Sequence, residues 1–279
     1  MEVYKLPVGK TIENSIDFFV ENFSFITKSI SHFTEAGIDL IVSAIMFFPP
    51  WLLILLASGA TFAATRKKGY GVGIFTLAGL TLIWNMRLWE PAVSTIALVV
   101  IATLISMCIG LPLGILAALN NTFYRIVMPV LDFMQTMPAF VYLIPAIPFF
   151  GLGPVAAIFS TVIFSVPPSI RLTCLGIKQV PAELVEAADA FACTKWQKLV
   201  KLQVPIATPT IMAGLNQTIM LALSMVVIAA MIGAKGLGGE VWKAIQRLQP
   251  GKGFEAGIGI VIIAIILDRV MQQFGEKRD

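Results

Sequence analysis

Few residues of this sequence have the types and spacing that metal binding or catalysis requires. The single histidine, His32, has no second imidazole with which to share a metal ion, and the three cysteines, Cys108, Cys174 and Cys193, lack metal-ligand spacing. No ligand-spaced cluster of histidine, cysteine and carboxylate residues occurs in the chain. The sequence therefore predicts neither a metal site nor an enzyme active site.

A glycine-rich segment, GAKGLGGE at residues 233–240, superficially resembles a phosphate-binding loop. It lacks the full Walker pattern, in which a lysine and a serine or threonine follow the glycines. Because it stands at the end of an apolar run, we interpret it as a flexible turn.

Asp132 stands out because it lies inside an apolar run. A carboxylate at the centre of a membrane helix costs about 2.5–3.5 kcal/mol on insertion scales. One interpretation makes Asp132 a pathway or gate residue together with Gln135, and the other, which we favour, makes it a structural partner of Arg171 or of backbone groups. Further pathway candidates are Met134, Met137, Phe140 and Tyr142 in the same run, and Met220, Ser224 and Met225 in a later one.

Prolines and glycines indicate how the apolar runs bend and pack. Pro138, Pro145 and Pro148 interrupt the run that holds Asp132, which predicts a broken helix beside a pathway. Gly110 and Gly114 form a small-xxx-small pair that lets two helices approach closely.

The composition places these runs in a membrane. Hydrophobic residues make up 57% of the 279 residues and charged residues only 13%, and the mean hydropathy is +0.87. A span needs about 20 mostly apolar residues, so we predict an all-α membrane protein, a polytopic helical bundle of about seven transmembrane helices. The qualifying runs are 41–64, 69–86, 92–118, 127–148, 152–170, 207–233 and 255–273.

The lysines and arginines are scattered in short loops, which argues against a nucleic-acid partner despite the net charge of +4. Arg66, Lys67 and Lys68 follow the first run and place its end in the cytoplasm, by the positive-inside rule. We therefore expect the N-terminus outside and the tail, residues 274–279, in the cytoplasm. With this orientation the loop 234–254 lies outside the cell, where its lysines and arginines, four in total, contradict the rule.

The first 40 residues predict an amphipathic helix that precedes N-terminal transmembrane helices at 41–90 and a core domain at 91–273. Two interpretations stay open: the helix lies on the membrane surface, or it packs against the other helices, because its polar face lacks the usual lysines and arginines. Its apolar stripe consists of Ile12, Ile16, Phe19, Phe23, Ile26, Ile30 and Phe33.

A charged segment at 180–205 interrupts the apolar runs. Pro181 favours a helix start, so a first helix is expected at 182–192. Thr194 and Gln197 have the spacing of a capping box, so a second helix should begin there and end near Pro205. The resulting hairpin projects into the cytoplasm, either as an ordinary loop against anionic head groups or, as its small alanines favour, as a docking site for a partner protein.

The hairpin sequence EAADAFACTKWQKLVKLQVP resembles the cytoplasmic signature of permease subunits in binding-protein-dependent ABC importers. Four residues match the pattern, and Ala192 replaces its glycine, which bears on the geometry of the turn. The matching residues are Glu186, Ala187, Ala188 and Pro205.

Further stretches, such as LDFMQTMPAFVYLIPA and AGIGIVIIAIILDR, resemble the permeases of glycine betaine/proline (quaternary amine) importers over roughly residues 90 to 272. The resemblance implies a type I importer permease fold like that of methionine importers, in the bacterial cytoplasmic membrane. It also implies a second permease copy, two cytoplasmic ATPase subunits that use ATP and magnesium, and an extracytoplasmic substrate-binding protein. This chain would be a non-catalytic pore subunit with no cofactor of its own, and the binding protein would carry selectivity for the compatible solute.

In that family the matching hairpin is the coupling helix that sits in a groove of the ATPase. The residues implied to contact the ATPase are Glu186, Ala187, Ala188, Phe191, Ala192 and Pro205.

Three rival functions make different predictions. An ion-driven secondary transporter of small zwitterions would have buried charged residues near the midplane and two related halves with matching broken helices, and neither is clear in the sequence. A structural scaffold would leave the capped hairpin without a purpose. An enzyme is least favoured because no catalytic constellation is visible.

Overall fold

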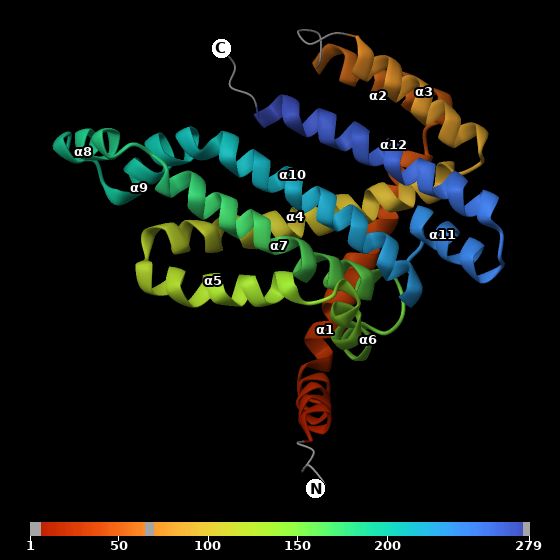
Figure 1. Ribbon diagram of the computed structural model, residues 1–279, viewed down its shortest axis with the longest axis horizontal. Helices are drawn as coiled ribbons and strands as arrows, with labels where there is room; N and C mark the ends of the chain where they lie inside the picture. The colour runs from red at the N-terminus through yellow and green to blue at the C-terminus, as the bar shows by residue number, and fades with distance from the viewer. Residues whose placement is uncertain (1–6, 65–69, 276–279) are drawn as a thin grey trace, which may run out of the picture.

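The computed structural model describes residues 7–64 and 70–275, which fold into helices joined by short connections (Figure 1). The helices in chain order are α1 (Val8–Met46), α2 (Pro50–Ala64), α3 (Gly71–Asn85), α4 (Trp89–Leu119), α5 (Asn121–Thr136), η1 (Ala139–Tyr142), α6 (Leu143–Phe150), α7 (Pro154–Lys178), α8 (Ala182–Ala190), α9 (Lys195–Lys198), η2 (Leu199–Gln203), α10 (Val204–Ala229), η3 (Ala230–Ile232), α11 (Leu237–Gln246) and α12 (Pro250–Gly275). The described residues contain no strand, so the expected all-α class is confirmed.

The core of the bundle is α7, which packs against α4 on one side and α10 on the other. Small residues make these contacts close. A Cβ atom added to Gly110 would overlap Ser169, and one added to Gly114 would lie 2.6 Å from the Cβ of Thr173. The expected close approach at the glycine pair is therefore confirmed, because only glycine leaves room for α7 at these two positions.

Three helices are long and apolar enough to cross a membrane within the described residues, and five spans result if each of two bent helix pairs counts as one. The expected number of about seven is reached if α3 and α12 cross as well. The second bent pair joins α5 to η1 and α6 at an angle of 110°. Met137 is extended there because the following Pro138 disfavours a helical conformation in the residue before it. The predicted broken helix is thus confirmed.

The first apolar run is also bent. Helix α1 continues past the expected boundary at residue 40 to Met46, and α2 leaves at an angle of 94° after Pro49. Near its C-terminal end α1 contributes Ile38 to the core and packs against α4 and α6. Its N-terminal part projects from the bundle, and the stripe residues Phe19 and Phe33 are exposed there (Figure 1). The side chains of Ile12, Phe23 and Ile26 lie outside the described part.

Two expectations for the connections were wrong. The helix that begins after Thr194 does not end near Pro205, because α9, η2 and α10 form one continuous helical path over residues 195–232. Pro205 lacks an N–H and cannot donate a helical hydrogen bond. The π turn of η2 accommodates this, because the Val204 amide donates to the Leu199 carbonyl and the helix continues.

Nor is the loop at 234–254 a loop throughout. It contains α11, and the glycine-rich segment forms the packed entry to this helix instead of a flexible turn. The amide of Leu237 donates to Thr95 Oγ1 at 2.8 Å, and Leu237 is fully buried. A Cβ on Gly238 would lie 2.7 Å from the Cα of Val227, so the glycines allow close packing against α10.

The long helices place two features at opposite ends of the molecule (Figure 1). The hairpin of α8 and α9 lies at one end of the long axis, and α11 lies at the other. The C-terminal end of α12 points toward the same end as the hairpin. The membrane therefore separates the hairpin from α11 if the long helices span it.

Candidate coupling hairpin and pathway residues

The first helix of the hairpin, α8, ends in a Schellman motif. The Cys193 amide donates to the Ala188 carbonyl at 3.1 Å, and the Ala192 amide donates to the Asp189 carbonyl at 2.9 Å. Ala192 has a φ of +52°, the left-handed conformation in which glycine is favoured. Ala192 thus stands where the permease signature has glycine, and it adopts the left-handed conformation that glycine adopts most easily.

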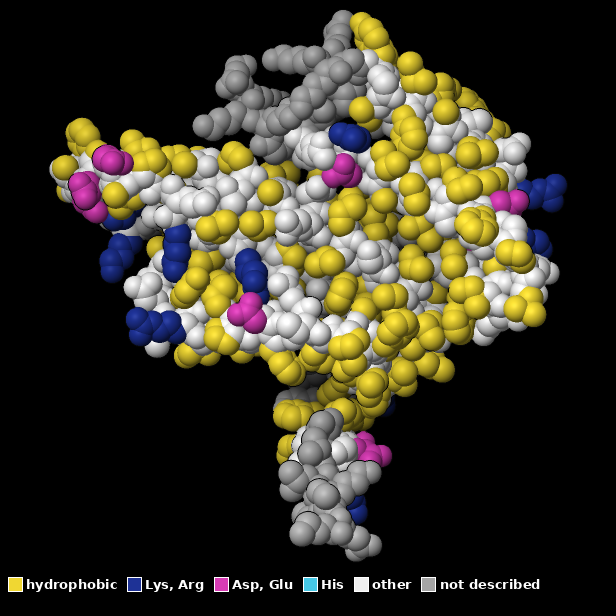
Figure 2. Space-filling model, in the orientation of Figure 1, with side chains coloured by type: hydrophobic (Ala, Val, Ile, Leu, Met, Phe, Trp, Pro, Cys, Tyr) yellow, Lys and Arg dark blue, Asp and Glu magenta, His cyan; other side chains and the backbone are white. Residues whose placement is uncertain are grey.

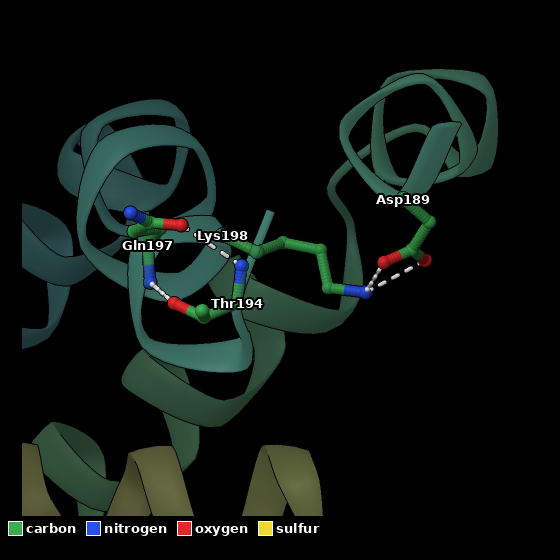
Figure 3. Close-up of polar contacts among 4 residues, drawn as sticks. All are labelled: Asp189, Thr194, Gln197 and Lys198. Carbon is green, nitrogen blue, oxygen red and sulfur yellow. Dashed lines mark hydrogen bonds and ion pairs between the residues drawn. The ribbon is translucent and has the colours of Figure 1, made fainter. Parts of the chain in front are cut away.

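The second helix, α9, begins with the predicted capping box (Figure 3). The amide of Gln197 donates to Thr194 Oγ1 at 3.2 Å, and the amide of Thr194 donates to Gln197 Oε1 at 2.9 Å. Two amides at the start of the helix, which no backbone carbonyl could satisfy, therefore have partners. This reciprocal cap fixes where the chain turns from α8 into α9.

An ion pair holds the two helices of the hairpin together (Figure 3). Lys198 Nζ lies 2.7 Å from one carboxylate oxygen of Asp189 and 2.8 Å from the other. Asp189 comes from α8 and Lys198 from α9, so the contact spans the turn at Ala192. Asp189 is 55% exposed and Lys198 is 19% exposed, so the pair is partly screened by water and contributes only a modest stabilisation.

The hairpin presents uncovered apolar side chains. No residue of α8 is buried, and Phe191 and Trp196 have exposed fractions of 85% and 71%. Both flank the turn, and the candidates Glu186 and Ala187 on α8 are exposed as well. Two large aromatic side chains this exposed are typical of a surface that another protein covers.

The remaining candidates have different positions. Ala188 is half-buried on α8, and Ala192 is exposed at the turn. Pro205 is exposed too, but it belongs to α10 and lies beyond the π turn. Glu186 also lines a hollow of about 320 Å³ between the hairpin and the ends of α4 and α7, which sequence reasoning missed because no local pattern marks it.

The hairpin is anchored firmly to the spans. Leu199 is buried against Ile177 of α7 and Ala207 of α10, in a small apolar cluster at this end of the bundle. Helix α9 runs through η2 into α10 without a break, and α10 packs on the central helix α7. The second helix of the hairpin is thus continuous with the bundle, whereas α8 contributes no buried residue.

Asp132 and Arg171 form an ion pair between α5 and α7. The contact with Arg171 that the favoured interpretation named is therefore present, and a pathway role for Asp132 stays a prediction. The Asp132 side chain is 66% exposed in the single chain and that of Arg171 is 32% exposed. The pair thus links α5 to the central helix near the surface of the bundle.

The pathway candidates divide into two groups, and Met137, Tyr142, Met220 and Met225 belong to the main hydrophobic core cluster. Gln135, Phe140 and Ser224 are exposed, whereas Met225 and Tyr142 are buried in the core. The Tyr142 hydroxyl donates to the carbonyl of Met134, which joins the two sides of the bend. Half-buried positions are occupied by Met134, Met137 and Met220. Their role in a pathway stays a prediction.

The fold is that of a polytopic all-α membrane protein with a capped hairpin at one end. Residues 110–278 match the family described as "Binding-protein-dependent transport system inner membrane component". The chain belongs to this family, whose members are membrane permease subunits of ABC transporters.

Two curated relatives are similar over nearly their whole length. The chain is 50% identical to the glycine betaine/carnitine transport permease protein GbuB of Listeria monocytogenes serotype 1/2a (strain 10403S), over 98% of this chain and 96% of the relative. It is 49% identical to the glycine betaine transport system permease protein OpuAB of Bacillus subtilis (strain 168), again over 98% and 96%.

A solved structure supports the fold alone. An inward-facing structure of the MetNI methionine ABC transporter matches with a TM-score of 0.60 and 22% identity, over 64% of this chain and 92% of the other. The expected type I importer permease fold is therefore confirmed.

Proposed function

We propose that this chain is the transmembrane permease subunit of an ATP-driven importer that takes up glycine betaine or a related quaternary amine, as an osmoprotectant. The observation that carries the proposal is the 50% identity, over nearly the full length, to a permease named for glycine betaine and carnitine transport. The exposed hairpin supports it, because a permease that works with a separate ATPase subunit needs a contact through which to receive mechanical work.

The proposed assembly contains two copies of this chain, two cytoplasmic ATPase subunits and one extracytoplasmic binding protein. The N-terminus would lie outside and the hairpin and C-terminus inside. The hairpin and the C-terminal end of α12 point toward the same end of the molecule, which is consistent with this arrangement (Figure 1).

In this mechanism closure of the ATPase dimer moves the two hairpins, and each hairpin moves its bundle as a rigid body between inward-facing and outward-facing states. Glu186, Ala187, Ala188, Phe191 and Ala192 would contact the ATPase. Pro205, which lies beyond the π turn, would help set the angle between α9 and α10. The pathway candidates on α5 and α10 would line the route as the bundles separate.

Reconstitution tests the proposal directly. The chain is placed in vesicles with its ATPase and binding protein, and uptake of labelled glycine betaine is measured with and without ATP. We expect accumulation only when ATP is present. Accumulation driven by a proton or sodium gradient alone would contradict the proposal and would favour a secondary transporter.

A pair of variants tests the role of the hairpin. Ala188→Trp places bulk on the proposed contact face, and Ala36→Trp places the same bulk on an exposed position of α1. The first should abolish ATP-driven uptake while leaving membrane insertion intact, and the second should preserve uptake. Normal uptake by Ala188→Trp would remove the hairpin from the coupling contact.

A further inference from the structure

An apolar groove lies at the end of the molecule opposite the hairpin. It has a volume of about 940 Å³ and is formed by α11, α12 and a side chain of α3. None of the described residues that line it is charged. The lining includes the exposed residues Phe75, Ile245, Leu248, Phe254, Ile258 and Val261.

A charged pocket of about 420 Å³ adjoins this groove. The two share Ala244 and Gln249, at the end of α11 and in the turn to α12, as lining residues. Four cationic side chains and two carboxylates line the charged pocket, which leaves a net charge of about +2. The cations are Arg87, Lys243, Arg247 and Lys252, and the carboxylates are Glu240 and Glu255.

Three of these cations are available to a ligand. Lys243 pairs with Glu240 at 2.8 Å. Arg87, Arg247 and Lys252 are exposed and form no ion pair with any residue that the structure describes. They line one pocket, and Figure 2 shows Lys and Arg side chains beside hydrophobic ones at the end of the molecule where α11 lies. A surface of this kind is complementary to an anion that carries an apolar chain.

The backbone holds two of these residues in unfavourable conformations. Arg87 and Leu248 have φ angles of +58° and +52° and follow the ends of α3 and α11. Leu248 is also 87% exposed. An apolar side chain this exposed is disfavoured in water and is favoured if hydrocarbon covers it.

The position in the membrane agrees with this chemistry. Residues of the turns that follow α3 and α11 line the charged pocket, and the lining of the groove runs along α12 from Pro250 to Ile265. If the long helices span the membrane, this end lies at the level of the lipid phosphates. The positive-inside rule leaves the cations of residues 234–254 unexplained. They have a physical reason if they bind phosphate head groups.

We propose that the groove and the charged pocket together bind one anionic phospholipid. The phosphate lies among Arg87, Arg247 and Lys252, and one acyl chain lies in the groove along α11 and α12. This site does not depend on which solute the chain transports.

Native mass spectrometry of the full-length chain tests the site. The chain is purified in detergent and given equal amounts of dioleoyl phosphatidylglycerol and dioleoyl phosphatidylcholine, which have the same acyl chains. We expect the anionic lipid to be retained preferentially. The double variant Arg247→Gln/Lys252→Gln should bind it roughly thirtyfold more weakly, because it loses two cations at the head group.

A matched control removes the same charge elsewhere. Lys195→Gln/Lys201→Gln takes two exposed cations from the hairpin end, which lies opposite the groove, and should leave retention unchanged. Equal retention of the two lipids by the unmodified chain, or an equal loss in both double variants, would overturn the site.

The groove has its own test. Ile258→Trp fills it and should reduce retention of phosphatidylglycerol, and excess inorganic phosphate should not displace the lipid from the unmodified chain. Complete displacement by phosphate would mean that no acyl chain is held there. If Ile258→Trp instead converts dimers to monomers in the same spectra and leaves the lipid bound, the groove is an interface between two copies and the proposal is wrong.

Discussion

At the scale of single residues, three residues other than glycine have positive backbone φ angles within the described chain: Arg87, Ala192 and Leu248. Each follows the last turn of a helix, and each of these helix ends is closed by the same pattern of two backbone hydrogen bonds. At the end of α3, for example, the Leu88 amide donates to the Ile83 carbonyl at 3.1 Å and the Arg87 amide to the Trp84 carbonyl at 3.0 Å. These helices thus end in a motif that favours glycine, without using glycine.

Replacing Ala192 with glycine should stabilise the hairpin. The left-handed conformation costs a residue with a Cβ roughly 1–2 kcal/mol, so Ala192→Gly should stabilise the closed turn by about 1 kcal/mol. Hydrogen exchange of the Cys193 amide, which closes the motif, should slow about fivefold.

The control for this variant is Ala187→Gly, in the interior of α8. Glycine there has no left-handed conformation to relieve and should destabilise the helix by about 0.5–1 kcal/mol. If both variants change exchange in the same direction, the strain at Ala192 is not what limits the turn.

At the scale of helices, the tight contact between α4 and α7 depends on absent side chains. Gly114→Val would place a branched side chain against Thr173 and the Ile170 carbonyl, which lie within 3 Å of an added Cβ. Forcing the helices apart should cost about 1–3 kcal/mol and lower the temperature of unfolding in detergent.

Gly59→Val is the matched control for this variant. It inserts the same side chain into α2, where an added Cβ would meet nothing within 4 Å. Its unfolding temperature should stay within the small range of ordinary surface variants. An equal loss in both proteins would mean that the effect comes from helix propensity and not from packing.

Local signals in the sequence predicted the helical elements well. The capping box was readable because Thr194 and Gln197 satisfy each other within four residues, and the break before Pro138 follows from a steric rule about its neighbour. The continuity of α9 and α10 was not readable, because Pro205 normally interrupts a helix and only the π turn absorbs it. Helix α11 was missed because glycines such as Gly238 indicate a loop when the sequence is read locally. In the structure Gly238 instead allows α11 to pack closely against α10.

The candidate site was predictable only where its features depend on the local sequence. The hairpin has its own caps, so its position follows from its sequence. The pathway residues depend on how α5 and α10 are placed around α7, and the apolar sequence of α10 does not tell which of its side chains, such as Met225, is fully buried. The ion pair of Asp132 with Arg171 was foreseen only as one of two interpretations.

At the scale of the whole molecule, the exposed aromatic side chains of the hairpin should carry much of the affinity for the ATPase. Phe191→Ala and Trp196→Ala should each weaken binding of the ATPase subunit by about 2 kcal/mol or more, which is roughly thirtyfold in the dissociation constant. Phe33→Ala, on α1, is the control, because Phe33 is 83% exposed but lies away from the hairpin. Binding of purified ATPase to the reconstituted chain measures the three variants, and equal affinities would place the contact elsewhere.

The hairpin can act as a lever only if the helical path from α9 into α10 is stiff. An insertion of two glycines between Gln203 and Val204 interrupts this path where η2 meets α10, without changing the exposed surface of α8. We expect the ATPase to bind and hydrolyse ATP in the assembled complex, while uptake of labelled glycine betaine falls to background, because movement of the hairpin no longer reaches the spans. The same insertion next to Asn120, between α4 and α5, leaves the path intact and should preserve uptake. If the insertion at Gln203 leaves uptake unchanged, force reaches the bundle through another contact, such as Leu199 against Ile177.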